Sequence, residues 1–265
     1  MPAAQQLPTA AVTGATGAIG QAICLELASR GFQVIMITRD PQKSRRVRDE
    51  IRERTGREHI HYLLTDLSRR QAVQELSEKW SSKLKVLINN AAVTPQTRQE
   101  TPEGIELQFA TNVLGYFWMM EAFFPVLERS APSRIINVAS YWAGGLDLSD
   151  LEFKRRPYRN GAAYRQSKQA DRMLSRAFAE RFLDHGITVN SCHPGDVNST
   201  LSNNLGFGGH QTPAQGAETP VWLATAPEAA EFTGKYFENK SETRCSFSEN
   251  QKEVEALYEI CHNYH

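Results

Sequence analysis

Short apolar runs alternate with longer amphipathic segments along most of the chain. Strands are predicted at residues 9–13, 33–38, 59–64, 85–88, 134–139 and 187–192. Helices are predicted at residues 19–30, 41–55, 69–81, 102–129 and 162–185. Alternation of this kind is typical of βαβ units. We therefore expect an α/β, Rossmann-type fold, a doubly wound parallel sheet of six to seven strands with helices on both faces in three αβα layers.

Two polar stretches interrupt the alternation. Residues 144–161 form an insert between Ser140 and Tyr164, and residues 198–216 carry Gly206, Gly208 and Gly209. Each stretch follows the carboxyl end of a predicted strand, where sheets of this type bind ligands. We interpret them as a wall of the substrate site and a mobile lid, with plain surface loops as the alternative. No linker or internal repeat divides the chain, so residues 1–265 are expected to form a single domain.

Composition and charge narrow the function classes. Thirty acidic side chains balance thirty basic ones, so no overall field attracts nucleic acid or an anionic membrane. No apolar run approaches the roughly 20 residues that span a bilayer, and the first residues lack the pattern of a signal peptide. The four cysteines show no CxxC spacing, so we expect reduced thiols, no metal site and a cytoplasmic setting.

A glycine-rich turn follows the first predicted strand. In Thr13-Gly14-Ala15-Thr16-Gly17-Ala18-Ile19-Gly20, the glycines stand between a strand and a helix. Glycines at this place allow a tight turn and a close approach to a pyrophosphate, which a helix N-terminus stabilises. The turn predicts a dinucleotide site.

The end of the second strand bears on which nicotinamide cofactor is bound. Sites for NAD usually place an acidic residue about 20 residues beyond the glycines, where it binds the ribose 2′-hydroxyl. This chain has Thr38 and Arg39 there, and an arginine can pair with a 2′-phosphate. We predict NADP(H), although a small shift in register would bring Asp40 to the ribose. Asp66 is predicted to bind the adenine amino group, with a helix N-cap as the alternative.

Tyr164 and Lys168 are the strongest candidates for acid/base chemistry. Four residues apart on a helix, they lie on the same face. An ammonium group near the phenol favours the phenolate and lowers its pKa, which makes the tyrosine a usable general acid or base. Tyr236 and Lys240 repeat the spacing, but no comparable serine precedes them.

With the glycine turn, Asn89-Asn90-Ala91-Ala92, Asn112, Ser140 and Tyr164-xxx-Lys168 in this order, the chain resembles the short-chain dehydrogenase/reductase family over residues 9–240. The resemblance implies that Tyr164 exchanges a proton with the substrate oxygen and that Ser140 stabilises this oxygen. Lys168 would hold the nicotinamide ribose, and Asn112 would anchor a water that relays protons.

The resemblance also implies a set of cofactor-binding residues. The run 194–200 would contact the nicotinamide carboxamide and the phosphates. The complete set is Gly14, Thr16, Gly17, Ile19, Gly20, Thr38, Arg39, Asp66, Leu67, Asn90, Ala91, Tyr164, Lys168, Pro194, Gly195, Val197 and Ser199. Each residue has a structural alternative, such as a cap or a turn.

Three departures from the family pattern refine the expectation. The glycine spacing TGxxGxxG is commoner in the larger epimerase branch, but the short remainder after Gly195 favours the single-domain branch. Ala92 replaces the usual glycine. The insert resembles that of retinol dehydrogenase-like and carbonyl reductase-like members. Many retinol-type enzymes have an N-terminal membrane anchor. This chain starts almost at its first strand, so we expect no anchor and a retinoid substrate is disfavoured.

The leading hypothesis is an NADPH-dependent reductase of an apolar or aromatic aldehyde or ketone, with Trp142 and Phe207 as candidate lining residues. An alcohol dehydrogenase would use the same residues in reverse. A third hypothesis is a regulatory or scaffold protein that binds NADP(H) without turnover, which would be expected to have lost Tyr164 or Lys168. Related folds often dimerise or tetramerise through the long helices after strands four and five. The insert before Tyr164 can obstruct that face, and members with such inserts are sometimes monomers, so we expect a monomer or a homodimer.

Overall fold

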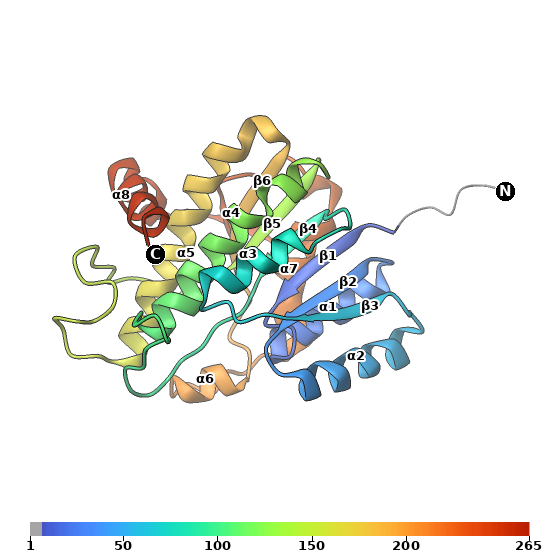
Figure 1. The fold of residues 1–265 in the computed structure, drawn as a ribbon, viewed down its shortest axis with the longest axis horizontal. Helices are drawn as coiled ribbons and strands as arrows, with labels where there is room; N and C mark the ends of the chain where they lie inside the picture. Colours follow the sequence, from blue (N-terminus) through green and yellow to red (C-terminus); the bar gives the residue numbers. More distant parts are fainter. Residues whose placement is uncertain (1–6, 265) are drawn as a thin grey trace.

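An eight-stranded sheet runs through the centre of the molecule in the order β3-β2-β1-β4-β5-β6-β7-β8 (Figure 1). The computed structural model describes residues 7–264. The strands are β1 (Thr9–Thr13), β2 (Gln33–Thr38), β3 (Ile60–Leu64), β4 (Val86–Asn89), β5 (Ser133–Val138), β6 (Ile187–His193), β7 (Tyr236–Glu238) and β8 (Ser241–Thr243). The expected doubly wound sheet is confirmed, since β1 to β7 pair in parallel.

The eighth strand is an addition that the sequence pattern did not reveal. β8 pairs antiparallel with β7 through a tight turn at Asn239 and Lys240, whose φ angles are 50° and 61°. Positive φ at both turn residues suits a two-residue hairpin. Tyr236 therefore lies on a strand and Lys240 in a turn, so this pair does not share a helix face as Tyr164 and Lys168 do.

Helices cover both faces of the sheet, as expected (Figure 1). One apolar core joins the sheet to α1, α2 and α7, and the other joins it to α3, α4, α5 and α8. The helices are α1 (Ala18–Ser29), α2 (Pro41–Thr55), α3 (Arg70–Glu78), α4 (Gly115–Glu128), α5 (Asn160–Phe182), α6 (Thr200–Asn204), α7 (Pro213–Thr225) and α8 (Gln251–His262). Successive strand residues face opposite cores because side chains alternate across a sheet: Ala10 and Val12 face one and Ala11 the other.

The helix predicted at residues 102–129 begins later than the sequence suggested. Residues 102–106 lie outside it, and the π-helical segment η1 (Phe109–Leu114) precedes α4. The carboxylate of Glu106 accepts the backbone N–H groups of Gln108 at 2.9 Å and Phe109 at 2.7 Å. This buried carboxylate satisfies two of the free donors that every helix start presents, which fixes the start of the helix.

The two interrupting stretches contain more helix than expected. Residues 144–159 are irregular, but α5 already begins at Asn160, within the predicted insert. The predicted lid contains α6 and the first residues of α7. From residue 7 to residue 264, no helix combines the length and the apolar character needed to cross a membrane.

Candidate functional site

The glycine turn is held against the end of β4. Gly14 has φ +63°, and a Cβ placed on it would lie 2.7 Å from the Cα of Ala91, so only glycine fits. The hydroxyl of Thr13 accepts the N–H of Asn90 at 2.8 Å and of Ala91 at 3.1 Å. The Asn90 amide donates to the Thr13 carbonyl at 2.9 Å. The run Asn89-Asn90-Ala91-Ala92 therefore shapes the glycine turn.

A cavity of about 730 Å³ opens at the carboxyl ends of β1, β2 and β4. It brings together eleven of the residues predicted at the cofactor. These are Gly14, Thr16, Gly17, Ile19, Gly20, Thr38, Arg39, Leu67, Asn90, Ala91 and Ser199. Gly17 is the N-cap of α1 and offers no side-chain cap, so the free N–H groups of the first turn are available to an anion. The volume and this uncapped helix start fit a dinucleotide with its pyrophosphate at α1.

The end of β2 places two cations at the same cavity. Arg39 and Lys43 both line it, together with Asp40. The Asp40 carboxylate accepts the N–H groups of Gln42 at 2.9 Å and Lys43 at 3.0 Å, which makes it the N-cap of α2. These hydrogen bonds hold its pKa below the ordinary value. Sequence reasoning missed Lys43, although its place in the first turn of the helix after Arg39 was a usable signal.

Asp66 lies in the turn between β3 and α3. The cavity is lined by its neighbours Thr65 and Leu67, and Asp66 is not among the lining residues. Its carboxylate accepts the N–H of Ser68 at 3.1 Å and the Ser68 hydroxyl at 2.7 Å. This arrangement shapes the turn before α3, close to the structural alternative considered for it.

Ser140, Tyr164 and Lys168 meet beyond the end of β5. Tyr164 lies in the second turn of α5, and the Lys168 ammonium is 5.9 Å from the centre of its ring. Ser140 lies two residues beyond the end of β5, and its hydroxyl accepts the backbone N–H of Trp142 at 3.1 Å. Ser140 is near enough to the Tyr164 phenol to lower its pKa. All three side chains belong to buried residues.

Burial has the largest effect on the acidity of Tyr164. It raises the pKa of the phenol, while Lys168 and Ser140 lower it, and the net direction is upward. The sequence reading considered only the effect of Lys168. The tyrosine is therefore protonated at neutral pH in this structure.

Asn112 lies inside η1, with its side chain fully engaged. Its Oδ1 accepts the N–H of Val93 at 2.8 Å, and its Nδ2 donates to the Val93 carbonyl at 3.1 Å. Nδ2 also lies 3.4 Å from the hydroxyl of Ser167, in the turn of α5 between Tyr164 and Lys168. π-Helical turns are rare and frequently accompany functional sites.

Of the predicted cofactor-binding residues that follow β6, only Ser199 lines the cavity. Ser199 caps α6, where it and Ser202 form a capping box. Val197 pairs with Gln211 as an isolated bridge. Pro194, Gly195 and Val197 do not line the cavity described above.

Trp142, just before the insert, and Phe207 in the lid lie on the side of Tyr164 where a substrate would bind. The Trp142 ring is 6.1 Å from the Tyr164 ring and 5.7 Å from that of Phe207 in the lid. The carbonyl of Asn204 in α6 accepts hydrogen bonds from Gln96 at 2.6 Å and from Asn160 at 3.0 Å. An apolar aromatic surface therefore stands beside the phenol.

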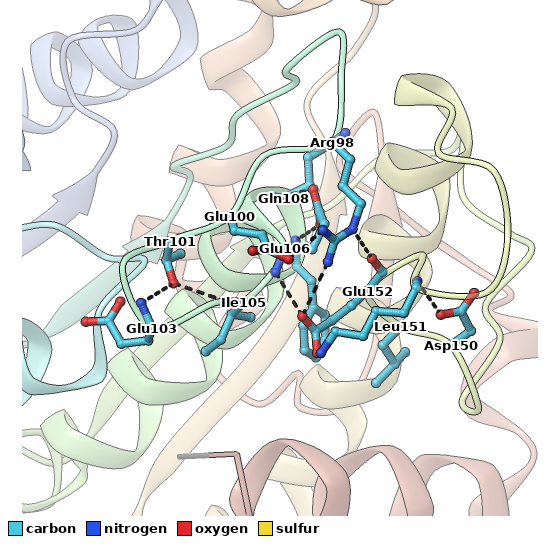
Figure 2. A network of polar contacts seen from close by, with 12 residues as sticks. Arg98, Glu100, Thr101, Glu103, Ile105, Glu106, Gln108, Asp150, Leu151 and Glu152 are labelled. Atoms are coloured by element: carbon cyan, nitrogen blue, oxygen red, sulfur yellow. Dashed lines mark hydrogen bonds and ion pairs between the residues drawn. The ribbon is translucent and has the colours of Figure 1, made fainter.

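A buried carboxylate network fixes the insert to the segment before η1. Figure 2 shows Arg98, Glu106 and Glu152 pointing towards one another. Glu152 accepts the N–H of Glu106 at 3.0 Å, and its backbone carbonyl accepts from Arg98 at 2.9 Å. Tyr264, beyond α8, also donates to Glu152. The network explains why this part of the insert is tied to the body of the molecule.

Comparison with known proteins agrees with this arrangement. The family model for short chain dehydrogenase matches residues 8–206. Retinol dehydrogenase 13 of Homo sapiens is 34% identical over 87% of this chain and 76% of its own length. Dehydrogenase/reductase SDR family member 12 of Homo sapiens is 32% identical over 94% of this chain and 83% of its own length.

Solved structures with lower identity share the fold. An uncharacterised protein from Mycobacterium paratuberculosis matches with a TM-score of 0.80 and 24% identity, covering 97% of this chain and 95% of that one. An actinorhodin polyketide ketoreductase with NADPH gives a TM-score of 0.69 and 23% identity over 94% of this chain and 99% of that one. The 3-ketoacyl-(acyl-carrier-protein) reductase of Brucella melitensis, complexed with NADH, gives 0.69 and 23% over 88% and 96%.

The extent of the family match and the identity to these relatives lead to one conclusion. The chain belongs to the short-chain dehydrogenase/reductase family and is an oxidoreductase that interconverts carbonyl and alcohol groups with a nicotinamide cofactor.

Proposed function

We propose that the chain is an NADPH-dependent reductase of an aldehyde or ketone with an apolar or aromatic body. The observation that carries this proposal is the buried group of Ser140, Tyr164 and Lys168 in a chain that also forms a dinucleotide-sized cavity at the ends of β1, β2 and β4. A reductase needs a protonated acid at the carbonyl oxygen, and the upward-shifted pKa of Tyr164 supplies one at neutral pH.

Each side chain has a separate role in this chemistry. When bound, the nicotinamide supplies the hydride. The phenol of Tyr164 donates its proton to the carbonyl oxygen as charge develops there, and the Ser140 hydroxyl donates a hydrogen bond to the same oxygen. Lys168 stabilises the phenolate that remains. Asn112 supports this face of α5 through Ser167.

The cavity favours NADP(H) over NAD(H). Arg39 and Lys43 place two positive charges where β2 ends, and Asp40 uses its carboxylate to cap α2. A 2′-phosphate gains charge-assisted hydrogen bonds from such a pair. The actinorhodin ketoreductase named above carries NADPH, whereas the Brucella reductase carries NADH, so the preference rests on these residues of the chain.

The substrate side of the site favours an apolar ligand. Trp142 and Phe207 form an aromatic surface next to Tyr164. Such surfaces bind apolar bodies and leave one oxygen for the polar group. The relatives named as retinol dehydrogenases agree with an apolar substrate class without fixing its identity.

Consumption of NADPH by the purified protein against matched carbonyl compounds tests the proposal. Aromatic and aliphatic aldehydes and ketones are compared with charged or sugar-like carbonyls of similar size. We expect turnover of the apolar members with NADPH and much slower turnover with NADH. Tight binding of NADPH without turnover, with carbonyls or with alcohols and NADP in reverse, would favour a regulatory or scaffold protein instead.

A further inference from the structure

Asp171 is a fully buried acid next to the proposed catalytic lysine. It lies three residues after Lys168 on α5, and its Oδ2 is 2.9 Å from the Lys168 Nζ. The two side chains are 0% and 2% exposed. Within residues 7–264, the other carboxylate oxygen of Asp171 has no hydrogen-bond partner. The interactions of this carboxylate are therefore concentrated on one ammonium group.

The lysine is held on two sides by this contact and by β5. The Lys168 ammonium also donates to the carbonyl of Val138 at 2.9 Å. An ammonium has three donors, so one remains for a ligand or water. The aromatic rings of Tyr116 and Tyr164 lie 5.0 Å and 5.9 Å from the Nζ atom. Lys168 thus faces the phenol with its position already set.

No second cation competes for Asp171 among the described neighbours. Arg172, the next residue, turns away: it donates to the Ser140 carbonyl at 2.5 Å and stacks 3.5 Å above the Tyr236 ring. The aspartate and the lysine form a separate pair with a single charge on each side.

Three titratable groups from other elements lie near the pair and are neutral at neutral pH. Burial raises the pKa of Tyr116 on α4, of Cys192 on β6 and of Cys261 on α8. Asp196, after β6, acts on Tyr164 from further along the site and raises the pKa of the phenol. Burial raises the pKa of Asp171 to about 7, although Lys168 lowers it, so the carboxylate is ionised throughout the alkaline range in which a phenol titrates. In that range Asp171 is the charge that balances Lys168 directly.

The balance has a consequence for the phenol. Burial is the largest single influence on Lys168 and lowers its pKa, but Asp171, Tyr116 and Tyr164 together outweigh burial, so the net direction is upward. Asp171 contributes most to this upward shift. Lys168 lowers the pKa of Tyr164, whereas Asp171 raises it. The carboxylate thus weakens the effect by which the lysine would turn the phenol into a phenolate.

We propose that Asp171 is a positioning residue for the catalytic lysine, which it holds against β5 and whose charge it offsets, so that Tyr164 stays in its protonated form. This inference rests on the roles proposed above for Tyr164 and Lys168, and it adds a direction. A phenol that keeps its proton favours reduction of a carbonyl, whereas oxidation of an alcohol needs the phenolate.

A purely structural ion pair would be a costly way to attach α5 to β5. Removing two charges from water is costly, and apolar residues of similar size often stabilise a core as well or better. An electrostatic role at the neighbouring phenol gives this buried pair a function.

Titration of Tyr164 in the free protein tests the inference without any turnover. The difference in ultraviolet absorbance between the wild type and Tyr164→Phe, followed as a function of pH, isolates ionisation of this phenol. The same difference is then measured between Asp171→Asn and the double variant Asp171→Asn with Tyr164→Phe. Asp171→Asn keeps the shape of the side chain but removes its charge, so we expect the midpoint of the Tyr164 titration to fall by about one pH unit or more. The matched control is Glu106→Gln, which makes the same change at a buried carboxyl that does not contact Lys168, and it should leave the transition in place.

An unchanged or higher transition in Asp171→Asn would overturn the inference. Because this variant leaves Lys168 as an unpaired buried cation, its folding is checked by thermal unfolding. If it does not fold, Asp171→Ser provides the same comparison, since its smaller side chain leaves room for a water beside the ammonium.

The pH profiles of reduction and oxidation provide a second measurement, and a purely structural role of Asp171 would leave both profiles unchanged. In Asp171→Asn, the pH above which reduction declines should fall together with the pH at which oxidation begins. A lower kcat with both pH profiles unchanged would contradict the inference. A downward shift of the Tyr164 titration in a protein that turns over no carbonyl would support the role of Asp171 and count against the proposed function alone.

Discussion

Two glycines with nearly the same backbone angle serve different purposes. Gly14 has φ +63° and Gly56 has φ +65°. A Cβ on Gly56 would meet nothing within 4 Å, whereas a Cβ on Gly14 would lie 2.7 Å from the Cα of Ala91. Gly56 thus satisfies only a conformational requirement at the end of α2, and Gly14 also allows the approach of β4 to the glycine turn.

The pair Gly14→Ala and Gly56→Ala separates these two requirements. We expect Gly56→Ala to cost about 1–2 kcal/mol of unfolding free energy from its positive φ. Gly14→Ala should cost about 2–5 kcal/mol because the close contact adds to it, and it should also weaken NADPH binding. Urea unfolding and cofactor fluorescence measure both effects. Equal costs with unchanged binding would contradict this account of the turn.

Reversing one charge at the end of β2 tests the cofactor preference. Arg39→Asp should lower the ratio of NADPH to NADH affinity by about 10- to 100-fold, since it removes a charge-assisted contact and adds a repulsive one. Arg45→Asp is the matched control, because it makes the same change of charge at an exposed position of α2 outside the cavity. Similar ratios in the two variants would show that Arg39 does not select the phosphate.

Single residues were predictable where their chemistry is local. The spacing of Tyr164 and Lys168 identified a shared helix face, and the glycines identified a turn. Asp171 was not predictable, because an acid three residues after a lysine is usually a solvated pair, and only the packing of α4, β5 and α8 buries it. The net pKa shift of Tyr164 was missed for the same reason.

At the scale of elements, one buried acid, Asp150, holds the backbone of the insert in place. Asp150 accepts the N–H of Lys154 at 2.7 Å and of Arg156 at 3.0 Å, and it forms an ion pair with the Arg156 guanidinium at 3.2 Å. Burial alone would raise the pKa of Asp150, but the backbone N–H groups outweigh it and hold this pKa below the ordinary value.

Asp150→Asn should loosen the insert. At neutral pH we expect faster trypsin cleavage after Lys154 and Arg155, because the amide cannot accept the same set of donors. Asp147→Asn is the control. Among the described residues, the Asp147 carboxylate accepts hydrogen bonds only from Ser149, and it lies 3.7 Å from the Arg156 guanidinium. Equal cleavage rates in the two variants would show that Asp150 does not order the insert.

The effect of Asp150→Asn on the free energy of unfolding should depend on pH. A lowered folded-state pKa contributes stability above the ordinary Asp pKa, and this contribution disappears as the pH falls through the lowered value. The stability difference between the wild type and Asp150→Asn should therefore be largest at neutral pH and shrink in acid. A difference that grows in acid would contradict the assignment.

The elements themselves were largely predictable, and the exceptions have physical causes. The alternation of apolar runs located β1 to β6 within one residue at either end. The start of the helix before α4 was misplaced because Glu106, rather than the residues near Pro102, supplies the cap. The hairpin of β7 and β8 was missed because Asn239 and Lys240 do not form one of the glycine-containing turns that mark a hairpin in sequence.

On the scale of the whole molecule, α8 covers the helices through which related proteins often associate. Figure 1 shows α8 beside α5. Tyr258 of α8 packs against Phe117 of α4 at 5.2 Å and Phe178 of α5 at 5.3 Å between ring centres. Val254 and Leu257 are fully buried in the same core. We propose from this cover that the chain is a monomer.

Light scattering of the wild type and two variants of α8 tests this cover. We expect the wild type to be monomeric. Leu257→Asp places an unpaired charge in the core and should cost about 3–5 kcal/mol, with association through the uncovered apolar surface. Ala256→Asp, on the exposed side of the same helix, should change stability by no more than about 0.5 kcal/mol. A wild-type dimer that persists in both variants would contradict the monomer.

The central claim is that Tyr164 is the acid of an NADPH-dependent reductase, and one measurement tests it most directly. NADPH oxidation by the wild type and by Tyr164→Phe is followed with the best apolar carbonyl, alongside NADPH binding by fluorescence. The account predicts that the variant binds NADPH as the wild type does but loses at least about 100-fold in kcat, the usual range for removing a general acid. Turnover by Tyr164→Phe at the wild-type rate would contradict it.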